Sequence, residues 1–472
     1  MNFVSIIMVI FSLLAALDRI FGNKFGLGKE FEKGFMLLGT MTLTMAGMLI
    51  ITPAIGELLK PISTGFYELT GIDPSVIPAS ILANDMGGEP IANQLAVNEA
   101  IGKFNAFVVS SMMGVIISFN IPFALGIVKK ELHRELFLGI LCGVATVPVG
   151  CFVAGLILAL PLPLLLFDLL PIIIFAAIVS LGLAFIPDVC VKIFKVLGAG
   201  IKILITVGLA LGILRYLTGL EPIKGLAPIE GEPIMVCLGA SIVMSGAFPL
   251  IHIVSKLLQK PFERLGNSLG INSVSAVGFM SSLATNATTF GMMNQMDKKG
   301  AMLNSAFAMA GAFTFAGHLA YTMAKDTDYI LPMIVGKLVA GITSVAVAVF
   351  IYKRTEKKGT TEAGGRPIAA HPFATDGRGH RLWIEEADLV AKFVTVIPTL
   401  ELSKVTSVLL AESFGLLCGE TYVRSKLSRV EHGIFRELVQ LGLHLVAHNR
   451  NDARDVCKGD SRADGCPLEQ SI

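Results

Sequence analysis

The sequence predicts an all-α polytopic membrane protein, built as an inverted-repeat transporter with about nine transmembrane helices and two re-entrant hairpins. Of its 472 residues, 53% are hydrophobic and 16% are charged, and the mean hydropathy is +0.71. Average soluble domains carry about 25% charged residues, so this composition excludes an ordinary soluble protein. The chain also repeats itself, because Leu58–Pro61 returns as Leu258–Pro261 and Ala106–Phe107 returns as Ala306–Phe307. Duplicated halves in an apolar chain are typical of secondary transporters.

Nine segments are long and apolar enough to cross the membrane, since a spanning helix needs about 20 mostly apolar residues. They lie at 3–21, 35–59, 104–128, 135–160, 163–185, 193–218, 234–258, 301–323 and 330–352. The transmembrane body of residues 1–358 then divides into repeat 1 at 3–160, a linker span at 163–185 and repeat 2 at 193–353. We expect the first span to be retained, because no basic region precedes it, Asp18 and Arg19 close it and no small-residue cleavage site follows it.

Two further segments, 74–98 and 272–297, are predicted to be re-entrant and are called hairpin 1 and hairpin 2. Both are long enough to enter the membrane but are rich in polar residues and glycine. Irregular polar backbone at membrane depth is tolerated only where protein or a wet cavity covers it. The unpaired span at 163–185 inverts repeat 2 relative to repeat 1. We therefore expect the hairpins to enter from opposite faces, with their tips approaching each other near the midplane.

The distribution of lysine and arginine predicts the orientation, since cytoplasmic loops of membrane proteins collect these residues. One face receives the basic loops at 19–33, 129–134, 192–195, 256–264, 298–299 and 353–358. The opposite face receives only Lys60, Lys103, Lys224 and Lys325. The N-terminus is therefore predicted outside and the C-terminal end in the cytoplasm.

The tip of hairpin 1 carries the strongest candidate site residues. Asp85 and Glu89 flank a Met-Gly-Gly turn, and Asn84 precedes them. An ionised side chain at this depth costs at least about 2.5–3.5 kcal/mol, so it needs a partner, a cavity or a function. Two carboxylates favour a small cation, and Gly87 and Gly88 let the backbone approach a ligand. The structural alternative is that Asp85 caps a half-helix and Glu89 faces water.

Hairpin 2 offers neutral hydrogen-bonding groups at its tip, namely Thr285, Asn286, Thr288 and Thr289. Such groups suit the polar, uncharged end of a substrate, although the same residue types also cap broken helix ends. His318, in the span at 301–323, is a candidate to relay protons or respond to pH. A neutral histidine bonded to a carbonyl is its structural alternative.

The remaining polar and sulfur-containing side chains have structural interpretations. We expect Lys337 to pair with a carboxylate or reach an interface, and Asp168 and His252 to reach the membrane surface from near helix ends. The chain has no CxxC pair, which predicts buried thiols and not redox or metal sites at Cys142, Cys151, Cys190 and Cys237. We expect no metal, no cofactor and no nucleic-acid partner; the surroundings are the lipid bilayer.

Several motifs spread over residues 5–353 point to one family. They are Ala15–Ile20, Glu32–Met36, Asn84–Gly88, Ser111–Gly114, Phe290–Asp297, the region of His318, and Pro332–Leu338. These residues resemble the ethanolamine permease family of the bacterial ethanolamine-utilisation system. The resemblance implies uptake of ethanolamine across the inner (plasma) membrane for a downstream ammonia lyase. Two departures stand out: Gly317 occupies a position that is often acidic in this family, and Glu89 and Pro90 replace an aromatic or apolar pair.

The chemistry of ethanolamine agrees with this resemblance. At neutral pH the molecule is an ammonium with a hydroxyl group. A carboxylate on hairpin 1 and hydroxyl or amide groups on hairpin 2 would fit its two ends. Trp383, the only tryptophan, lies outside the transporter body, so an aromatic cage around the ammonium would have to use phenylalanine.

After residue 358 the composition changes. Residues 359–380 are expected to form a linker, and 381–472 a cytoplasmic extension that is helical or partly disordered. The tail residues His444, His448, Cys457 and Cys466 match no zinc pattern. A working domain and a fused or frame-shifted extension both stay open.

We therefore expect a carrier, not an enzyme, that imports ethanolamine by alternating access around the two hairpin tips. The alternatives are a carrier of another small cation or amino acid, a channel-like facilitator, and a membrane enzyme that uses Asp85 and Glu89 as an acid/base pair. The sequence specifies neither a coupling ion nor whether the protein forms a homo-oligomer.

Overall fold

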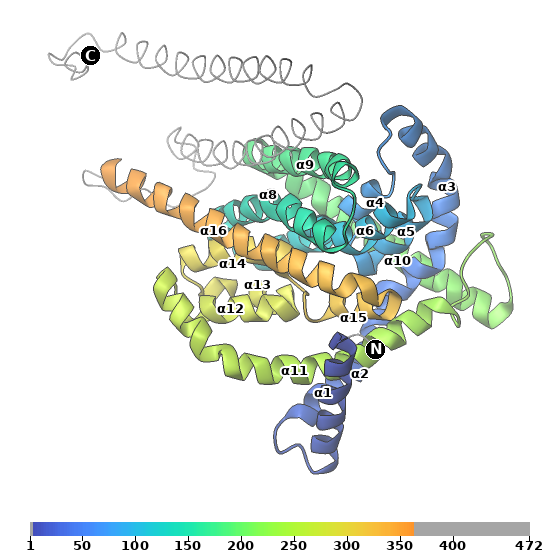
Figure 1. Ribbon diagram of the computed structural model, residues 1–472, viewed down its shortest axis with the longest axis horizontal. Coiled ribbons are helices and arrows are strands. Elements are labelled where there is room, and N and C mark those ends of the chain that lie inside the picture. The colour runs from blue at the N-terminus through green and yellow to red at the C-terminus, as the bar shows by residue number, and fades with distance from the viewer. Residues whose placement is uncertain (1–2, 363–472) are drawn as a thin grey trace, which may run out of the picture. The chain divides into compact units, whose positions relative to one another are not determined.

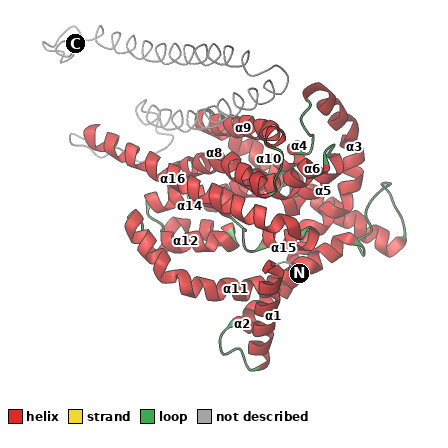
Figure 2. Ribbon diagram, viewed as in Figure 1, coloured by secondary structure: helices red, strands yellow, loops and turns green. Residues whose placement is uncertain are grey.

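The chain folds into helices joined by short loops, as Figures 1 and 2 show. We describe residues 3–362 of a computed structural model, with side chains as far as residue 354; all belong to one unit, Met1–Pro398. No strand occurs within residues 3–362. The extension expected at 381–472, and the linker expected at 359–380 from residue 363 onward, lie outside the described residues.

The first half of the body runs from α1 to α9. Its α-helices are α1 (Phe3–Ile20), α2 (Leu27–Met41), α3 (Gly47–Thr70), α4 (Val76–Ile81), α5 (Gly88–Leu95), α6 (Glu99–Phe104), α7 (Ile121–Ile127), α8 (His133–Ile157) and α9 (Leu162–Phe185). Three segments between them are π-helical: η1 (Thr42–Ala46), η3 (Asn105–Gly114) and η4 (Ile116–Asn120). Two are 3-10 turns, η2 (Asn84–Met86) and η5 (Lys130–Leu132).

The second half runs from α10 to α16. Its α-helices are α10 (Pro187–Thr218), α11 (Glu232–Leu269), α12 (Ser273–Ala284), α13 (Asn286–Met292), α14 (Lys298–Gly311), α15 (Gly317–Lys325) and α16 (Ile330–Glu362). The 3-10 turns η6 (Met293–Gln295) and η7 (Thr327–Tyr329) join some of them.

Eight helical runs among the described residues are long and apolar enough to cross a membrane, and each overlaps one expected span. The ninth expected span, 301–323, is wrong as a continuous helix, because α14 ends at Gly311 and α15 begins at Gly317. Between them Phe313 has a φ of 59°, in the left-handed region that non-glycine residues seldom adopt. Tertiary hydrogen bonds hold this break: the Phe313 and Phe315 amides each donate at 3.0 Å, to the carbonyls of Ser282 and Leu283.

Hairpins 1 and 2 each return to the place where they began. In hairpin 1, which contains α4, η2 and α5, the Asp73 carboxylate accepts hydrogen bonds from the Val97 amide at 3.0 Å and the Asn98 amide at 2.8 Å. In hairpin 2, which contains α12, α13 and η6, the Asp297 carboxylate accepts one from the Asn272 amide at 2.8 Å. One aspartate thus ties together the two ends of each hairpin. Entry of the hairpins into a bilayer stays a prediction.

The first helix of each repeat packs against the other repeat. Helix α1 lies on α11, and α10 lies on α3. The backbones approach closely in both pairs: a Cβ on Gly246 would lie 2.3 Å from the Met8 carbonyl oxygen, and one on Gly208 would lie 2.0 Å from that of Gly47. Small residues permit such contacts between membrane helices. This reciprocal exchange is consistent with the expected inverted repeat, whose symmetry stays a prediction.

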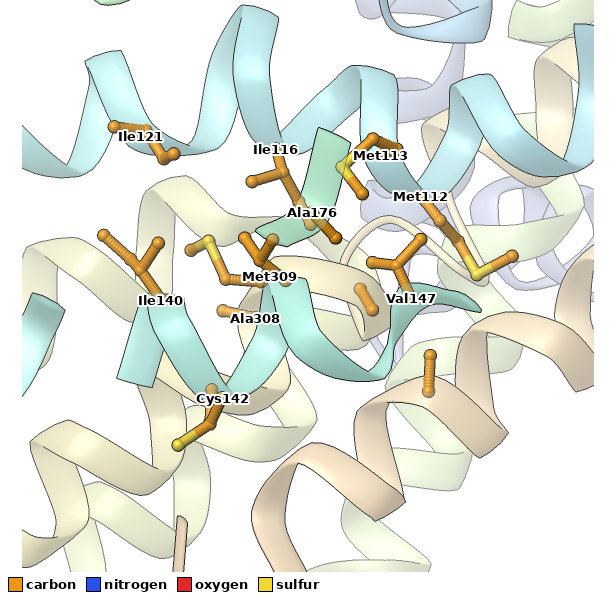
Figure 3. Close-up of a cluster of buried hydrophobic side chains, with 14 of the residues drawn as sticks. Met112, Met113, Ile116, Ile121, Ile140, Cys142, Val147, Ala176, Ala308 and Met309 are labelled. Carbon is orange, nitrogen blue, oxygen red and sulfur yellow. The ribbon is translucent and has the colours of Figure 1, made fainter. Parts of the chain in front are cut away.

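A hydrophobic core supports the η3 segment that faces hairpin 1. Figure 3 shows side chains of η3, η4 and α7 meeting those of α8, α9 and α14. The labelled residues are Met112, Met113, Ile116, Ile121, Ile140, Cys142, Val147, Ala176, Ala308 and Met309. Helix α16 runs alongside α8 and α14 (Figure 1), and Thr146 of α8 donates a hydrogen bond to the Ala340 carbonyl at 3.0 Å. Cys142, Cys151, Cys190 and Cys237 are free and buried, which confirms their predicted burial.

Candidate functional site

The tip of hairpin 1 is a tight turn in which α4 ends and α5 begins. Leu82 is extended, Asn84–Met86 form η2, and Gly87 has a φ of 103°. A Cβ on Gly87 would lie 2.5 Å from the Met48 side chain, and a Cβ on Gly88 would lie 2.3 Å from the Leu82 carbonyl oxygen. The turn itself therefore requires both glycines, whether or not a ligand is present.

Asp85 projects from this turn toward the start of α15. Its Oδ2 atom lies 3.9 Å from the position that a Cβ on Gly317 would occupy. Gly317 is the first residue of α15, and no side chain caps that end of the helix. The partial positive charge at a helix N-terminus stabilises a nearby carboxylate. No side chain among residues 3–354 donates a hydrogen bond to Asp85, so its charge is available to a ligand.

Asn84, next to Asp85, is completely buried. Neither its Oδ1 nor its Nδ2 atom has a hydrogen-bond partner in the part of the chain that the structure describes. A buried amide in this condition costs roughly 1–3 kcal/mol, and in native proteins it calls for an explanation such as a ligand or ordered water. Three elements surround the turn, because η2 contacts η1, η3 and α15.

Lys337 and His318 meet at one carbonyl of η3. Lys337 is fully buried, and its Nζ atom donates to the Ser111 carbonyl oxygen at 2.5 Å. His318 is 1% exposed and also hydrogen-bonds to the Ser111 backbone, which favours the structural alternative for this histidine. Its Nδ1 atom has no partner among residues 3–354. Lys337 interacts electrostatically with Asp85 but forms no direct ion pair with it.

A row of aromatic rings leads from His318 to hairpin 2. The ring centroid of Phe313 lies 5.3 Å from that of His318 and 5.7 Å from that of Phe119. Phe119 stacks on Phe123 at 5.1 Å, and Phe123 lies 6.4 Å from Phe290 of α13. Phe119 and Phe313 are only partly buried. Their faces are therefore candidates for contact with a cation.

Both hairpin tips are anchored at this aromatic row. The Ala83 amide of hairpin 1 donates to Ser118 Oγ at 3.1 Å, next to Phe119 in the chain. The Phe313 amide donates to the Ser282 carbonyl of hairpin 2. The two tips are thus attached to neighbouring segments, hairpin 1 to η4 and hairpin 2 to the break between α14 and α15. The approach of the tips near the midplane stays a prediction.

Glu89 links α5 to α15 and does not face water, so that alternative is wrong: only 3% of it is exposed. Its Oε2 atom accepts the Tyr321 hydroxyl at 2.7 Å and lies 3.3 Å from Lys325 Nζ. Its Oε1 atom accepts a hydrogen bond from the side-chain Nδ2 atom of Asn93 at 2.8 Å. Lys325 pairs in turn with Glu232 at the start of α11, at 2.5 Å. Both carboxylate oxygens of Glu89 are engaged, which makes it a poorer candidate ligand than Asp85.

Two polar residues of hairpin 2 are tied into the fold. Asn286 Nδ2 donates to Asn120 Oδ1 at 2.7 Å and to the Ala308 carbonyl at 3.1 Å. Thr289 Oγ1 donates to the Gly278 carbonyl at 3.1 Å. Both side chains are fully buried. These contacts hold α13 against α12, α14 and η4.

The other two candidates of hairpin 2, Thr285 and Thr288, do not share the arrangement seen at Asp85. The Thr285 side chain caps α13 by accepting from the Ala287 amide at 3.2 Å, as the capping alternative proposed. Thr288 is exposed. Of the ten residues proposed from sequence, the structure brings those of the hairpin 1 tip together with His318 at the start of α15.

Several residues near this site were not expected from the sequence. The Ser111 carbonyl gave no signal, because its availability depends on the π-helical distortion of η3. Phe119 and Phe313 are ordinary members of apolar segments. Lys337 was visible as a charge within the last span, but its partner was not.

A cavity of about 240 Å³ lies between α3, α4, α5 and α10 and shares Met48 and Leu82 with the hairpin 1 turn. Its lining is apolar apart from Ser63, so it does not suit a charged substrate. No group of three or more histidine, cysteine, aspartate or glutamate side chains with metal-binding geometry occurs among the described residues.

Comparison with known proteins shows a single family. Residues 1–351 match the family model described as "Ethanolamine utilisation protein, EutH". The protein named probable ethanolamine permease EutH from Listeria monocytogenes is 44% identical over 353 residues, which are 75% of this chain and 94% of that protein. Its namesake from Escherichia coli is 37% identical over 395 residues, covering 76% and 97%. The uncharacterized protein YxeR of Bacillus subtilis is 33% identical over 345 residues, covering 73% and 93%. No solved structure matches the chain.

Proposed function

The chain belongs to the EutH family of ethanolamine utilisation proteins, whose relatives are named permeases, and on that premise we propose that this multi-pass membrane protein imports ethanolamine by alternating access. A permease role makes catalysis unnecessary. The substrate assignment draws on the relatives' names and on the chemistry of the hairpin 1 tip.

The observation that carries the proposal is an available carboxylate beside a buried amide with no partner, at Asp85 and Asn84. The substrate ammonium would bind Asp85, with the ring faces of Phe119 and Phe313 nearby. The hydroxyl both donates and accepts hydrogen bonds, so it would satisfy the Asn84 amide. His318 Nδ1, which also lacks a partner within residues 3–354, is a further candidate for the hydroxyl.

Two clusters of ion pairs would hold one access route closed. Glu89 of hairpin 1 lies 3.3 Å from Lys325, which also pairs with Glu232 of α11. Lys103 of α6 lies 3.4 Å from Asp326. By the positive-inside rule this end of the molecule faces outward. Separation of these pairs would open a path from outside to Asp85, and movement of hairpin 2 would open the path to the cytoplasm.

Uptake of labelled ethanolamine into proteoliposomes tests the site. Asp85→Asn should reduce uptake at low substrate concentration by more than ~10-fold, because the neutral amide no longer attracts the ammonium. Glu131→Gln, which alters an exposed acid in η5, is the matched control and should transport normally. Equal uptake by Asp85→Asn and the control, in equally well-folded protein, would remove Asp85 from the site.

Competition by ethylamine tests the assignment of the hydroxyl. Ethylamine keeps the ammonium but lacks the hydroxyl, so it should compete roughly 10-fold or more weakly, since Asn84 is then left without a partner. Asn84→Ala should bind both amines weakly and lose most of this discrimination. Full discrimination in Asn84→Ala would place the hydroxyl elsewhere.

Two rival functions have their own tests. Trans-acceleration, in which internal ethanolamine speeds uptake, requires a carrier that reorients and would exclude a channel-like facilitator. Preferred competition by another small cation or an amino acid would identify a carrier of a different substrate. An acid/base pair of Asp85 and Glu89 is not favoured, because Glu89 is committed to Tyr321, Asn93 and Lys325.

A further inference from the structure

Besides Asp73, a second buried carboxylate, that of Asp168, lies at the base of hairpin 1. Asp168 of α9 is 3% exposed, which contradicts the expectation that it reaches the membrane surface. Its Oδ1 atom accepts a hydrogen bond from Asn105 Nδ2 at 3.0 Å. The same Nδ2 donates to Ser75 Oγ at 2.9 Å, and Ser75 Oγ donates to Asp73 Oδ1 at 2.6 Å. Four polar side chains from hairpin 1, η3 and α9 thus form one buried network.

The hydrogen bonds of this network satisfy Asp73 but not Asp168. Asp73 accepts from the Ser75 amide and hydroxyl and from the amides of Val97 and Asn98. Asp168 accepts one hydrogen bond, and its Oδ2 atom is buried without a partner among the described residues. Asn105 Oδ1 is likewise buried and unpartnered within residues 3–354.

No basic side chain in the described part of the chain forms an ion pair with Asp73 or Asp168. The titratable groups that interact with Asp168 are Asp73 and the Cys151 thiol of α8, and neither supplies a positive charge. A buried charge without a partner is strongly unfavourable, so Asp168 in its ionised form requires a compensating positive charge.

In hairpin 2 a single aspartate, Asp297, is enough to tie the two ends of the hairpin together. Asp297 accepts from the Asn272 and Gly300 amides and from Ser275 Oγ, all at 2.8–3.0 Å. Asn304 of α14 reaches the same base and donates to the Ser275 carbonyl at 2.8 Å. The tie between the ends of each hairpin is therefore achieved with one carboxylate. Asp168 is an addition to hairpin 1 that closing the hairpin does not explain.

We propose that Asp168, Asn105 and Ser75 bind a sodium ion at the base of hairpin 1. Oxygen ligands suit hard cations, and one uncompensated carboxylate matches a single positive charge. Asp73 positions Ser75 and has its own charge satisfied by hydrogen bonds. A divalent ion would keep an excess positive charge at this site.

The geometry permits the ion with a small change. The O and N atoms of an asparagine amide are assigned by their hydrogen bonds, and the amide can turn over. Turned over, Asn105 would present Oδ1 in place of Nδ2, about 3 Å from both Ser75 Oγ and Asp168 Oδ1. Oxygens about 3 Å apart are expected around a cation with bonds of roughly 2.3–2.6 Å, the range of calcium, whose radius sodium nearly shares.

Binding of radioactive sodium to the purified full-length protein, without ethanolamine, tests the site separately from the proposed substrate. Wild type should bind sodium saturably, and sodium should raise the temperature of thermal unfolding relative to choline. Asp168→Asn should weaken sodium binding by more than ~10-fold, because ligand charge sets cation affinity. Asp297→Asn, at the base of hairpin 2, is the matched control and should bind sodium as wild type does.

Each outcome supports or overturns the site. If Asp168→Asn does not fold, Asn105→Ala takes its place and should also lose the sodium-dependent stabilisation. Wild type without saturable sodium binding, or a folded Asp168→Asn with unchanged binding, overturns the proposal. Displacement of sodium by calcium at far lower concentration would also overturn it, in favour of a divalent site.

Discussion

Lys337 is the single residue whose charge bears most directly on Asp85. It is fully buried, and its Nζ atom donates to the Ser111 carbonyl. Apolar surroundings screen its charge poorly, so its attraction to Asp85 is felt without direct contact. On our proposal the substrate ammonium and Lys337 compete for the same carboxylate. Lys337 then offsets the charge of Asp85 while the carrier is empty.

Replacement of this lysine gives a prediction. Lys337→Met should lower the KM for ethanolamine roughly tenfold, because the competing positive charge is gone. Replacing a buried charge with an apolar side chain of similar length is often neutral or stabilising, so the protein should fold. The concentration dependence of uptake measures the effect, and Lys202→Met, at an exposed position on α10, is the control. A KM that rises or stays unchanged would show that Lys337 does not compete with the substrate.

At the scale of elements, the two repeats accommodate their hairpin tips differently. In repeat 1 the run from α6 to α7 stays helical, and its π-helical segments η3 and η4 adapt to the tip. There Gly114 touches the tip directly, because a Cβ on it would lie 2.0 Å from the Leu82 carbonyl oxygen. In repeat 2 the chain breaks between Gly311 and Gly317, and the freed amides donate to the tip.

Gly114→Ala tests whether this close contact positions the hairpin 1 tip. The added methyl group would force Leu82 away, which should lower the free energy of unfolding by about 1–3 kcal/mol and impair uptake. Gly126→Ala in the same helical run is the matched control, since nothing lies within 4 Å of its Cβ position. Its stability should be unchanged or slightly higher, because alanine favours helix by about 0.5–1 kcal/mol. Similar uptake and denaturation by both variants would contradict a role for this contact.

Hydropathy was sufficient for the long helices but not for the break at 312–316. That segment reads Ala-Phe-Thr-Phe-Ala, is mainly apolar and contains no proline. Its shape depends on amide donors meeting the Ser282 and Leu283 carbonyls, a long-range contact that local patterns do not encode. Asp85 could be predicted from the sequence, because its charge and the neighbouring glycines are local features. The role of the Ser111 carbonyl could not, because it depends on long-range contacts in the folded chain. Asp168 was misjudged because its partner Asn105 is distant in sequence.

At the scale of the whole transporter body, the contacts at the two hairpin bases support the expected inversion. The Lys129 amide, after α7, donates to Asn294 Oδ1 of hairpin 2 at 3.0 Å. At the opposite hairpin, Lys103, which follows hairpin 1, pairs with Asp326 after α15. Each hairpin base therefore lies beside a loop of the other repeat. An inverted pair of repeats would produce this arrangement, with one hairpin base on each face of the bilayer.

Labelling of single cysteines in intact cells tests this topology. In a variant whose seven native cysteines are alanine, Lys129→Cys and Lys298→Cys should both resist a membrane-impermeant thiol reagent until the cells are opened. Lys60→Cys, in the C-terminal half of α3, should react from outside, because this part of α3 is predicted to lie on the face that carries few basic residues. All three positions are exposed, so accessibility reports their side of the membrane. Because the Lys129 amide bonds to hairpin 2 and Lys298 directly follows that hairpin, opposite labelling of these two positions would be incompatible with hairpin 2 returning to its face of entry.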